Sequence, residues 1–204
     1  MVGSGGPWNI NIHYDRLLAE ICRPGERVLD VGCGEGFLSS RLAGLGCDVV
    51  AMDRDRDVLE RARRRWAGRQ VRWLHADVLD GTIDGVECGF DVVVSNATLH
   101  HLPDTAVALQ RLSDLLQPGG RLGVVGFARN DFSDWPRSLI GAVGKFVMNR
   151  VMGKWEHSAP TSWPPPLSYG QVRRLSHQVL PGCRYRRLWL GRYFLTRSKP
   201  VAEA

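Results

Sequence analysis

Short apolar segments alternate with longer amphipathic segments between residues 27 and 128. The apolar segments predict five strands: Arg27–Val31, Asp48–Met52, Val71–Leu74, Phe90–Ser95 and Arg121–Phe127. The amphipathic segments predict helices over residues 37–45, 56–66 and 105–116, the last of them ended by Pro118-Gly119-Gly120. Alternation of this kind is typical of right-handed crossovers and a parallel sheet. We therefore predict an α/β, Rossmann-like fold, with a mostly parallel sheet and helices on both of its faces.

The pattern changes after residue 128. An amphipathic segment over about residues 138–155 predicts a helix, and three prolines follow it at 164–166. Ser168 suits the N-cap of another helix, which ends near Leu180. The segments Arg184–Leu190 and Arg192–Arg197 are separated by Gly191 alone, so we predict an antiparallel C-terminal hairpin.

The composition limits the class of protein. With 204 residues, 44% of them hydrophobic, the chain can fill one core. It has no run of eighteen apolar residues and no signal-peptide pattern, so we expect a cytoplasmic protein without a membrane partner. The five cysteines form no C-x-x-C pair, which disfavours zinc and a disulfide framework. The net charge of +6 fits acidic ligands or nucleic acid, and equally a simple preference for arginine.

A glycine-rich turn follows the first predicted strand, in the segment Val28–Gly36. Its glycines at 32, 34 and 36 allow a sharp turn and the close approach of a ligand to a helix N-terminus. The dinucleotide fingerprint G-x-G-x-x-G would need glycine where Phe37 stands. Asp30, two residues before the first glycine, would repel a pyrophosphate but suits the ammonium group of an amino acid. S-adenosylmethionine, with a nucleoside at one end and an amino acid at the other, fits this turn.

Two further acids follow the next two predicted strands. Asp53 closes the second strand, where a carboxylate can accept hydrogen bonds from both ribose hydroxyls. Asp77 follows the third strand, where it can accept from the adenine amino group. Taken alone, Asp77 is more simply explained as a turn residue. Three acids at the ends of three successive strands, with the glycine turn at the first, are nevertheless a combination that chance rarely produces.

Residues 28–126 resemble a class I S-adenosylmethionine-dependent methyltransferase. The segments that carry the resemblance are VLDVGCGEG, VVAMDRD, HADVLD, FDVVVSNATLHHL and LLQPGGRLGVV. The resemblance implies a seven-stranded sheet, to which the C-terminal hairpin adds the antiparallel strand. It also implies that S-adenosylmethionine is the cofactor, with its methionine part at Asp30, Gly32 and Asn96, its ribose at Asp53 and its adenine at Asp77. The cofactor-binding residues that we predict are His13, Asp30, Gly32, Gly34, Asp53, Arg54, Asp77, Val78 and Asn96.

In this light residues 1–204 are one methyltransferase domain in four parts. The parts are an N-terminal lid (1–26), a cofactor-binding core (27–128), an insertion on the acceptor side (129–167) and a helix with the C-terminal hairpin (168–204). A monomer or a homodimer fits such a domain.

The methyl acceptor is expected beyond the end of the fourth strand. Methyl transfer is an in-line displacement that needs alignment and exclusion of water, and a base helps where the acceptor is a hydroxyl or a protonated amine. His100 and His101 are our first candidates for that base, with His157 behind them, although one of the pair could simply hold its loop. The residues predicted to contact the acceptor are Tyr14, Trp155, Glu156, Trp163 and Tyr169. Packing explains Trp163, beside three prolines, more simply than ligand binding.

Several functions compete at this stage. We favour a small-molecule acceptor methylated on O, N or C, with specialised metabolism as one setting. An RNA methyltransferase is the alternative, but Asn96-Ala97-Thr98-Leu99 lacks the prolines and aromatic residue that stack a flipped base, so nucleic acid is not expected as a partner. Asp30 and Phe37 argue against an oxidoreductase, and a non-catalytic protein that binds S-adenosylmethionine stays open. We expect no metal site, because Asn96 and aliphatic residues stand where catechol-type enzymes hold magnesium.

Overall fold

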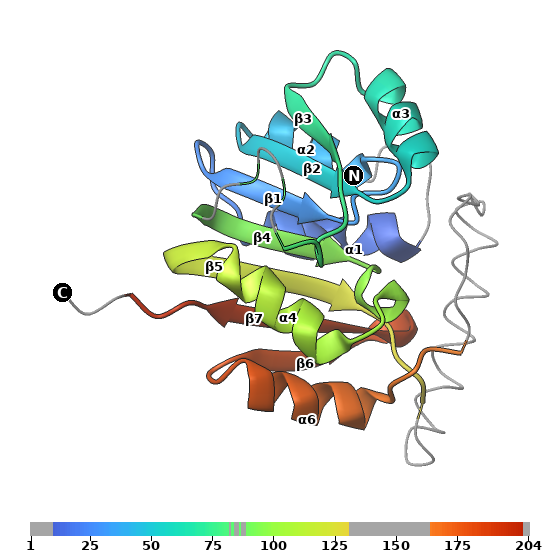
Figure 1. The fold of residues 1–204 in the computed structure, drawn as a ribbon, viewed down its shortest axis with the longest axis vertical. Helices are drawn as coiled ribbons and strands as arrows, with labels where there is room; N and C mark the ends of the chain where they lie inside the picture. The colour runs from blue at the N-terminus through green and yellow to red at the C-terminus, as the bar shows by residue number, and fades with distance from the viewer. Residues whose placement is uncertain (1–9, 82, 84–85, 87–88, 131–163, 202–204) are drawn as a thin grey trace.

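The computed structural model describes residues 10–81, 83, 86, 89–130 and 164–201. Its strands are β1 (Arg27–Val31), β2 (Asp48–Asp53), β3 (Val71–His75), β4 (Phe90–Asn96), β5 (Leu116–Gly126), β6 (Arg184–Leu188) and β7 (Arg192–Ser198). In the described part of the chain they form one seven-stranded sheet in the order β3-β2-β1-β4-β5-β7-β6 (Figure 1). Strands β1 to β5 are parallel, and β7 is antiparallel to both of its neighbours. The predicted Rossmann-like sheet with a C-terminal hairpin is confirmed.

Helices cover both faces of this sheet. They are α1 (Ile10–Ala19), α2 (Phe37–Gly44), α3 (Arg56–Arg65), α4 (Thr105–Asp114) and α6 (Tyr169–Val179), with short 3₁₀ turns η1 (Leu99–His101) and η3 (Trp189–Gly191). Leu18 of α1 and Leu42 of α2 pack on one face, in a cluster that includes Val92 of β4. Leu109 of α4 packs on the opposite face, in a cluster that includes Val93. Because neighbouring residues of β4 belong to opposite clusters, the strand is buried on both sides, as its continuous apolar sequence predicts.

Local signals explain where several helices begin. Asp55 caps α3 by accepting hydrogen bonds from two backbone N–H groups of its first turn. Ser168 forms a capping box with Gln171 at the start of α6, which confirms the predicted N-cap. The N-terminal lid contains α1, a helix that the sequence did not predict.

Two predicted boundaries are wrong. Helix α4 ends at Asp114, and Pro118-Gly119-Gly120 lies inside β5 rather than ending the helix. Phe90 pairs with Leu116 but Val92 pairs with Arg121, so the intervening residues of β5 bulge out of the ladder and accommodate the proline.

The other wrong boundary is the hairpin turn. It contains Trp189, Leu190 and Gly191 rather than Gly191 alone, because Leu188 pairs directly with Arg192. Leu190 and Gly191 have φ angles of 59° and 69°, so two consecutive residues adopt left-handed backbone conformations. Such a conformation is costly for leucine, and neighbouring side chains must hold it.

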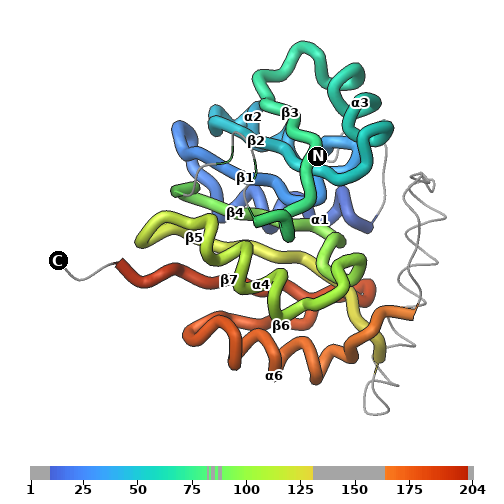
Figure 2. The backbone as a smooth tube through the Cα atoms, in the orientation of Figure 1, coloured from blue at the N-terminus to red at the C-terminus, as the bar shows by residue number. Residues whose placement is uncertain are grey.

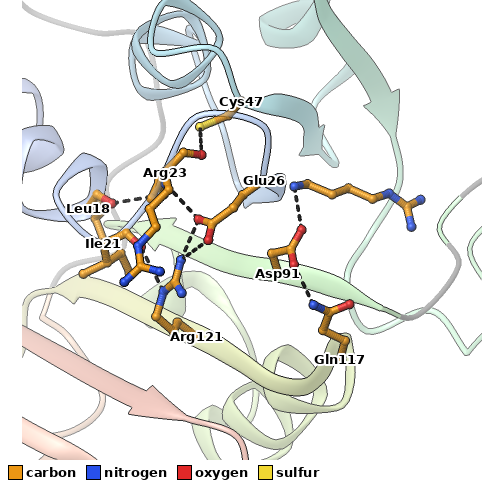
Figure 3. Close-up of polar contacts among 10 residues, drawn as sticks. Leu18, Ile21, Arg23, Glu26, Cys47, Asp91, Gln117 and Arg121 are labelled. Atoms are coloured by element: carbon orange, nitrogen blue, oxygen red, sulfur yellow. Dashed lines mark hydrogen bonds and ion pairs between the residues drawn. The ribbon is translucent and has the colours of Figure 1, made fainter.

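A polar network closes the amino-terminal end of the strands (Figure 3). The Arg121 guanidinium donates to Glu26 Oε1 at 2.6 Å, and the Arg23 backbone N–H donates to Glu26 Oε2 at 2.8 Å. Asp91 accepts from the Arg27 backbone N–H at 2.8 Å and from the Gln117 amide at 2.6 Å. Every carboxylate oxygen of this network has a donor, so its chemistry is satisfied within the chain. At the carboxyl ends of the strands, by contrast, one buried side-chain acceptor has no donor among the described residues.

Candidate active site

Most of the predicted cofactor residues lie at the carboxyl ends of β1, β2 and β4, along one edge of the sheet that can be followed in the backbone trace (Figure 2). Asp30 of β1 is buried, and its Oδ2 accepts from the Ser39 hydroxyl at 2.6 Å. Asp53 of β2 accepts from the backbone N–H of Gly34 at 2.8 Å and from that of Asp55 at 2.9 Å. The glycine turn is therefore tied to the carboxylate that we predict to bind the ribose.

Gly32 and Gly34, the two glycines predicted to bind the cofactor, are each required for a different structural reason. A Cβ atom at Gly32, where φ is 70°, would lie 2.2 Å from the Thr98 hydroxyl oxygen, so packing within the chain excludes a side chain there. A Cβ atom at Gly34, where φ is 52°, would meet nothing within 4 Å. The backbone at Gly34 therefore faces open space, which is what the close approach of a ligand requires.

Asn96 presents an unsatisfied acceptor at the end of β4. Its amide nitrogen donates to the Asn11 carbonyl at 3.0 Å and to Asp15 Oδ1 at 2.8 Å, which fixes the orientation of the amide. Its Oδ1 is buried and has no hydrogen-bond partner among the described residues. A buried acceptor without a donor costs about 1–3 kcal/mol, so a ligand donor at this position would restore that free energy.

Asp15 of α1 is a site residue that the sequence did not reveal. It is buried beside Asn96, and burial raises its pKa to about 7, with the hydrogen bond from Asn96 lowering it and the charge of Asp30 raising it. Burial likewise raises the pKa of Asp30 to about 7, against the hydrogen bond from Ser39. Two buried carboxyls with raised pKa values favour a cation between them. No motif marks Asp15, because its place depends on how α1 packs against β4.

This set of groups suits S-adenosylmethionine. Its amino-acid end carries an ammonium group, which Asp30, Asp15 and the Asn96 oxygen would hold. The ribose role of Asp53 stays a prediction, and its carboxylate is placed at the end of β2. Gly34, whose backbone faces open space, donates to Asp53 and so links the glycine turn to the predicted ribose site.

The residues predicted at the adenine end of the cofactor have contacts that are explained within the chain or are exposed. Asp77 Oδ1 accepts from the Leu79 backbone N–H at 2.9 Å, which is the turn role that we weighed against adenine binding. Val78 is buried, and its carbonyl accepts from Arg111 at 3.2 Å. The Arg54 side chain is exposed. The adenine roles of these residues remain predictions.

His100 and His101 lie in η1, directly after β4. The His100 ring contacts two rings at a tilt of 44°: His101, at 3.9 Å between centroids, and Phe127, at 3.7 Å. Burial, together with the charges of His101 and Arg192, lowers the pKa of His100 to about 3. His100 is thus neutral at pH 7, and its buried Nδ1 has no hydrogen-bond partner among the described residues.

The tyrosines predicted to contact the acceptor brace the hairpin turn. The Tyr14 hydroxyl donates to the Trp189 carbonyl, and the Tyr169 hydroxyl donates to the Gly191 carbonyl at 2.7 Å. Both tyrosines are buried, and burial raises the pKa of Tyr14. His13, predicted at the cofactor, is exposed on α1 with its ring centroid 4.8 Å from that of Tyr14.

Four predicted site residues lie outside the described residues. They are Trp155, Glu156, His157 and Trp163, and the helix predicted over residues 138–155 is outside them as well. The described ranges contain no group of three potential metal ligands. None of their helices is long and apolar enough to cross a membrane.

Comparisons with known proteins agree with this geometry. A family model described as a methyltransferase domain matches residues 28–120. An uncharacterized methyltransferase of Mycobacterium tuberculosis is 48% identical over 196 residues, which cover 96% of this chain and 98% of that protein. A ubiquinone biosynthesis O-methyltransferase of Xanthomonas campestris is 34% identical over 153 residues, which cover 72% of this chain and 60% of that protein.

A solved structure extends the agreement to the fold. It is the phosphoethanolamine N-methyltransferase 2 of Haemonchus contortus in complex with phosphomonomethylethanolamine and S-adenosylhomocysteine. Its TM-score is 0.66 at 18% identity, and the match covers 97% of this chain and 54% of that one.

Proposed function

The chain belongs to the class I S-adenosylmethionine-dependent methyltransferases, and we propose that its methyl acceptor is a small molecule, methylated on O, N or C. One observation carries the proposal. Tyr14 of α1 and Tyr169 of α6 hold the turn before β7, and the rings of His100 and Phe127 lie in contact after β4 and β5; Tyr14, His100 and Tyr169 are buried. An acceptor region lined by buried aromatic side chains suits a compact molecule better than a polymer.

The cofactor supplies a methyl group that its sulfonium already activates. The residues of this chain therefore have to bind, align and exclude water. Asp30, Asp15 and Asn96 bind the charged amino-acid end. The rings of His100 and Phe127 form an apolar wall on the acceptor side.

Proton removal from the acceptor falls to His101 in this proposal. A base works best when its pKa lies near the working pH, and a pKa of about 3 makes His100 a weak proton acceptor. Since the His100 ring contacts both His101 and Phe127, it is better suited to hold the His101 ring in place. His157 remains a proposed base whose position is outside the described residues.

RNA is the competing acceptor. The net charge of +6 favours it, but charge alone gives binding that weakens steeply with salt. The curated relative that acts in ubiquinone biosynthesis is an O-methyltransferase, and this supports the small-molecule assignment. Specialised metabolism is a setting that we retain within the proposal.

The test is the transfer of a labelled methyl group. Purified protein is incubated with methyl-labelled S-adenosylmethionine and with either the small-molecule fraction or the RNA fraction of a cell extract, at physiological salt. We expect label in the small-molecule fraction, and its loss in Asp53→Ala. Label that enters RNA and persists at this salt concentration would overturn the proposal.

A further inference from the structure

Arg192 lies on the acceptor side of the site, at the start of β7. Its neighbour Tyr193 pairs with Gly126, so Arg192 stands beside the carboxyl end of β5. The guanidinium lies 4.7 Å from the centroid of the Phe127 ring, which also lies 3.7 Å from the centroid of the His100 ring. The Phe127 ring therefore contacts both the Arg192 guanidinium and the ring of His100.

Among the described residues, Arg192 makes polar contacts with neutral groups. It donates to the Gly191 carbonyl at 3.2 Å and to the Asn11 side-chain oxygen at 3.1 Å. Its Nε is buried and has no hydrogen-bond partner in the part of the chain that the structure describes. Within that part, no carboxylate forms an ion pair with it.

A partly buried cation that has no counter-ion among the described residues is costly, and burial lowers the pKa of Arg192. Arg121 at the opposite end of the sheet shows the usual solution, because it is paired with Glu26. The guanidinium fork matches carboxylate and phosphate oxygens in particular. An incoming oxyanion would therefore supply the counter-charge that the described residues do not provide.

The side chain is also held in place before any ligand arrives. The turn that precedes it has left-handed conformations at Leu190 and Gly191, and the hydroxyls of Tyr14 and Tyr169 hold the carbonyls on either side of Leu190. Such a braced turn fixes where β7 begins, which lowers the entropic cost of binding at Arg192.

The position of Arg192 points to the acceptor rather than to the carboxylate of the cofactor. Strand β7 is three strands from β1, which is about 14 Å at the usual strand spacing. Asn11 lies between the two regions, since its carbonyl accepts from Asn96 and its side chain accepts from Arg192. The methionine part of the cofactor belongs with Asn96, on the far side of Asn11.

We propose that Arg192 binds an oxyanion of the methyl acceptor, so that the acceptor is an acidic small molecule carrying a carboxylate or a phosphate. This inference rests on the proposed function, because it assumes that the acceptor binds beside His100 and Phe127. It assigns Arg192 to recognition of the acceptor and leaves the transfer itself to the groups described above.

The experiment uses the complex of the protein with S-adenosylhomocysteine and three ring compounds of similar size: benzoate, phenyl phosphate and the neutral benzamide. Imidazole NMR signals of His100, assigned with His100→Gln, report binding beside Phe127. We expect saturable shifts with at least one anion and none with benzamide. Arg192→Gln is expected to weaken anion binding at least tenfold, and Arg192→Lys to restore it in part. Arg184→Gln, an equal loss of charge at an exposed position of the same hairpin, is the control.

The outcomes separate this inference from the proposed function. Equal shifts with benzamide, or no shift with either anion, would overturn the role of Arg192 while S-adenosylhomocysteine still binds. A loss of S-adenosylhomocysteine affinity in Arg192→Gln would assign the arginine to the cofactor and overturn the inference as well. Failure of the wild-type protein to bind S-adenosylhomocysteine at all would instead contradict the proposed function.

Discussion

Cofactor binding is expected to depend on pH through Asp15 and Asp30. Both carboxyls have a pKa of about 7 in the free protein, and burial is the main cause for each. At pH 6 each is about nine-tenths protonated, and it must lose that proton before it can hold an ammonium group. Binding therefore improves as the pH rises, because a cation stabilises the charged form of both groups.

The expected size follows from the pKa values. If the ligand returns a carboxyl to its usual pKa of about 4, the affinity rises by about eightfold per carboxyl between pH 6 and pH 7.5. Two carboxyls together give about seventyfold. Because Asp15 and Asp30 influence one another, the two protons leave as a coupled pair, and the total change is more reliable than its division between them.

Isothermal titration calorimetry with S-adenosylhomocysteine measures this directly. The ammonium group of this ligand stays charged over the chosen range, and repeating the titration in buffers of different ionisation enthalpy gives the number of protons released. Asp15→Asn is expected to keep the affinity at pH 6 and to lose about half of the logarithmic gain at pH 7.5. Asp48→Asn, at an exposed position at the start of β2, is the control. An affinity that does not change with pH in the wild-type protein would refute the reasoning.

Three further predictions concern single positions. Asp53→Ala is expected to weaken S-adenosylmethionine binding by about 1–3 kcal/mol in calorimetry, and unchanged affinity would refute the ribose assignment. Gly32→Ala is expected to lower the free energy of unfolding in urea by about 1–3 kcal/mol. Gly34→Ala is expected to lower it by about 1 kcal/mol and mainly to weaken cofactor binding. Equal losses of stability in the two variants would contradict this distinction. His101→Gln is expected to slow turnover by roughly 10²–10⁴-fold, with partial recovery of the rate at high pH. His100→Gln is expected to show no such recovery. The reverse pattern in the pH–rate profiles would exchange the roles of the two histidines.

Much of the fold could be predicted because its signals are local. The alternation of apolar segments gave the strands, and the Ser168 capping box marks the start of α6. The errors arose where long-range pairing determines the boundary. Pro118-Gly119-Gly120 has the composition of a helix stop, yet β5 begins before it because Leu116 pairs with Phe90.

The same division holds for the candidate site. The glycine turn, Asp30 and Asp53 could be predicted because strand ends and glycines are visible in the sequence. Asp15 and Arg192 could not, since each gains its role from a helix or hairpin that packs against a distant strand. Tyr14 and Tyr169 were singled out from the sequence, but their hydroxyls hold the hairpin turn, a contact that no local pattern contains.

The crystal structure of the complex with S-adenosylhomocysteine tests the central claim most directly. We predict the ligand ammonium group beside Asp30, Asp15 and the Asn96 oxygen, the ribose hydroxyls on Asp53, and the sulfur facing the space between Asn96 and His101. Arg192 is predicted to lie beyond the sulfur without contact to the ligand. A ligand whose amino-acid end lies away from Asp30 and Asn96, or whose carboxylate is bound by Arg192, would contradict this account of the site.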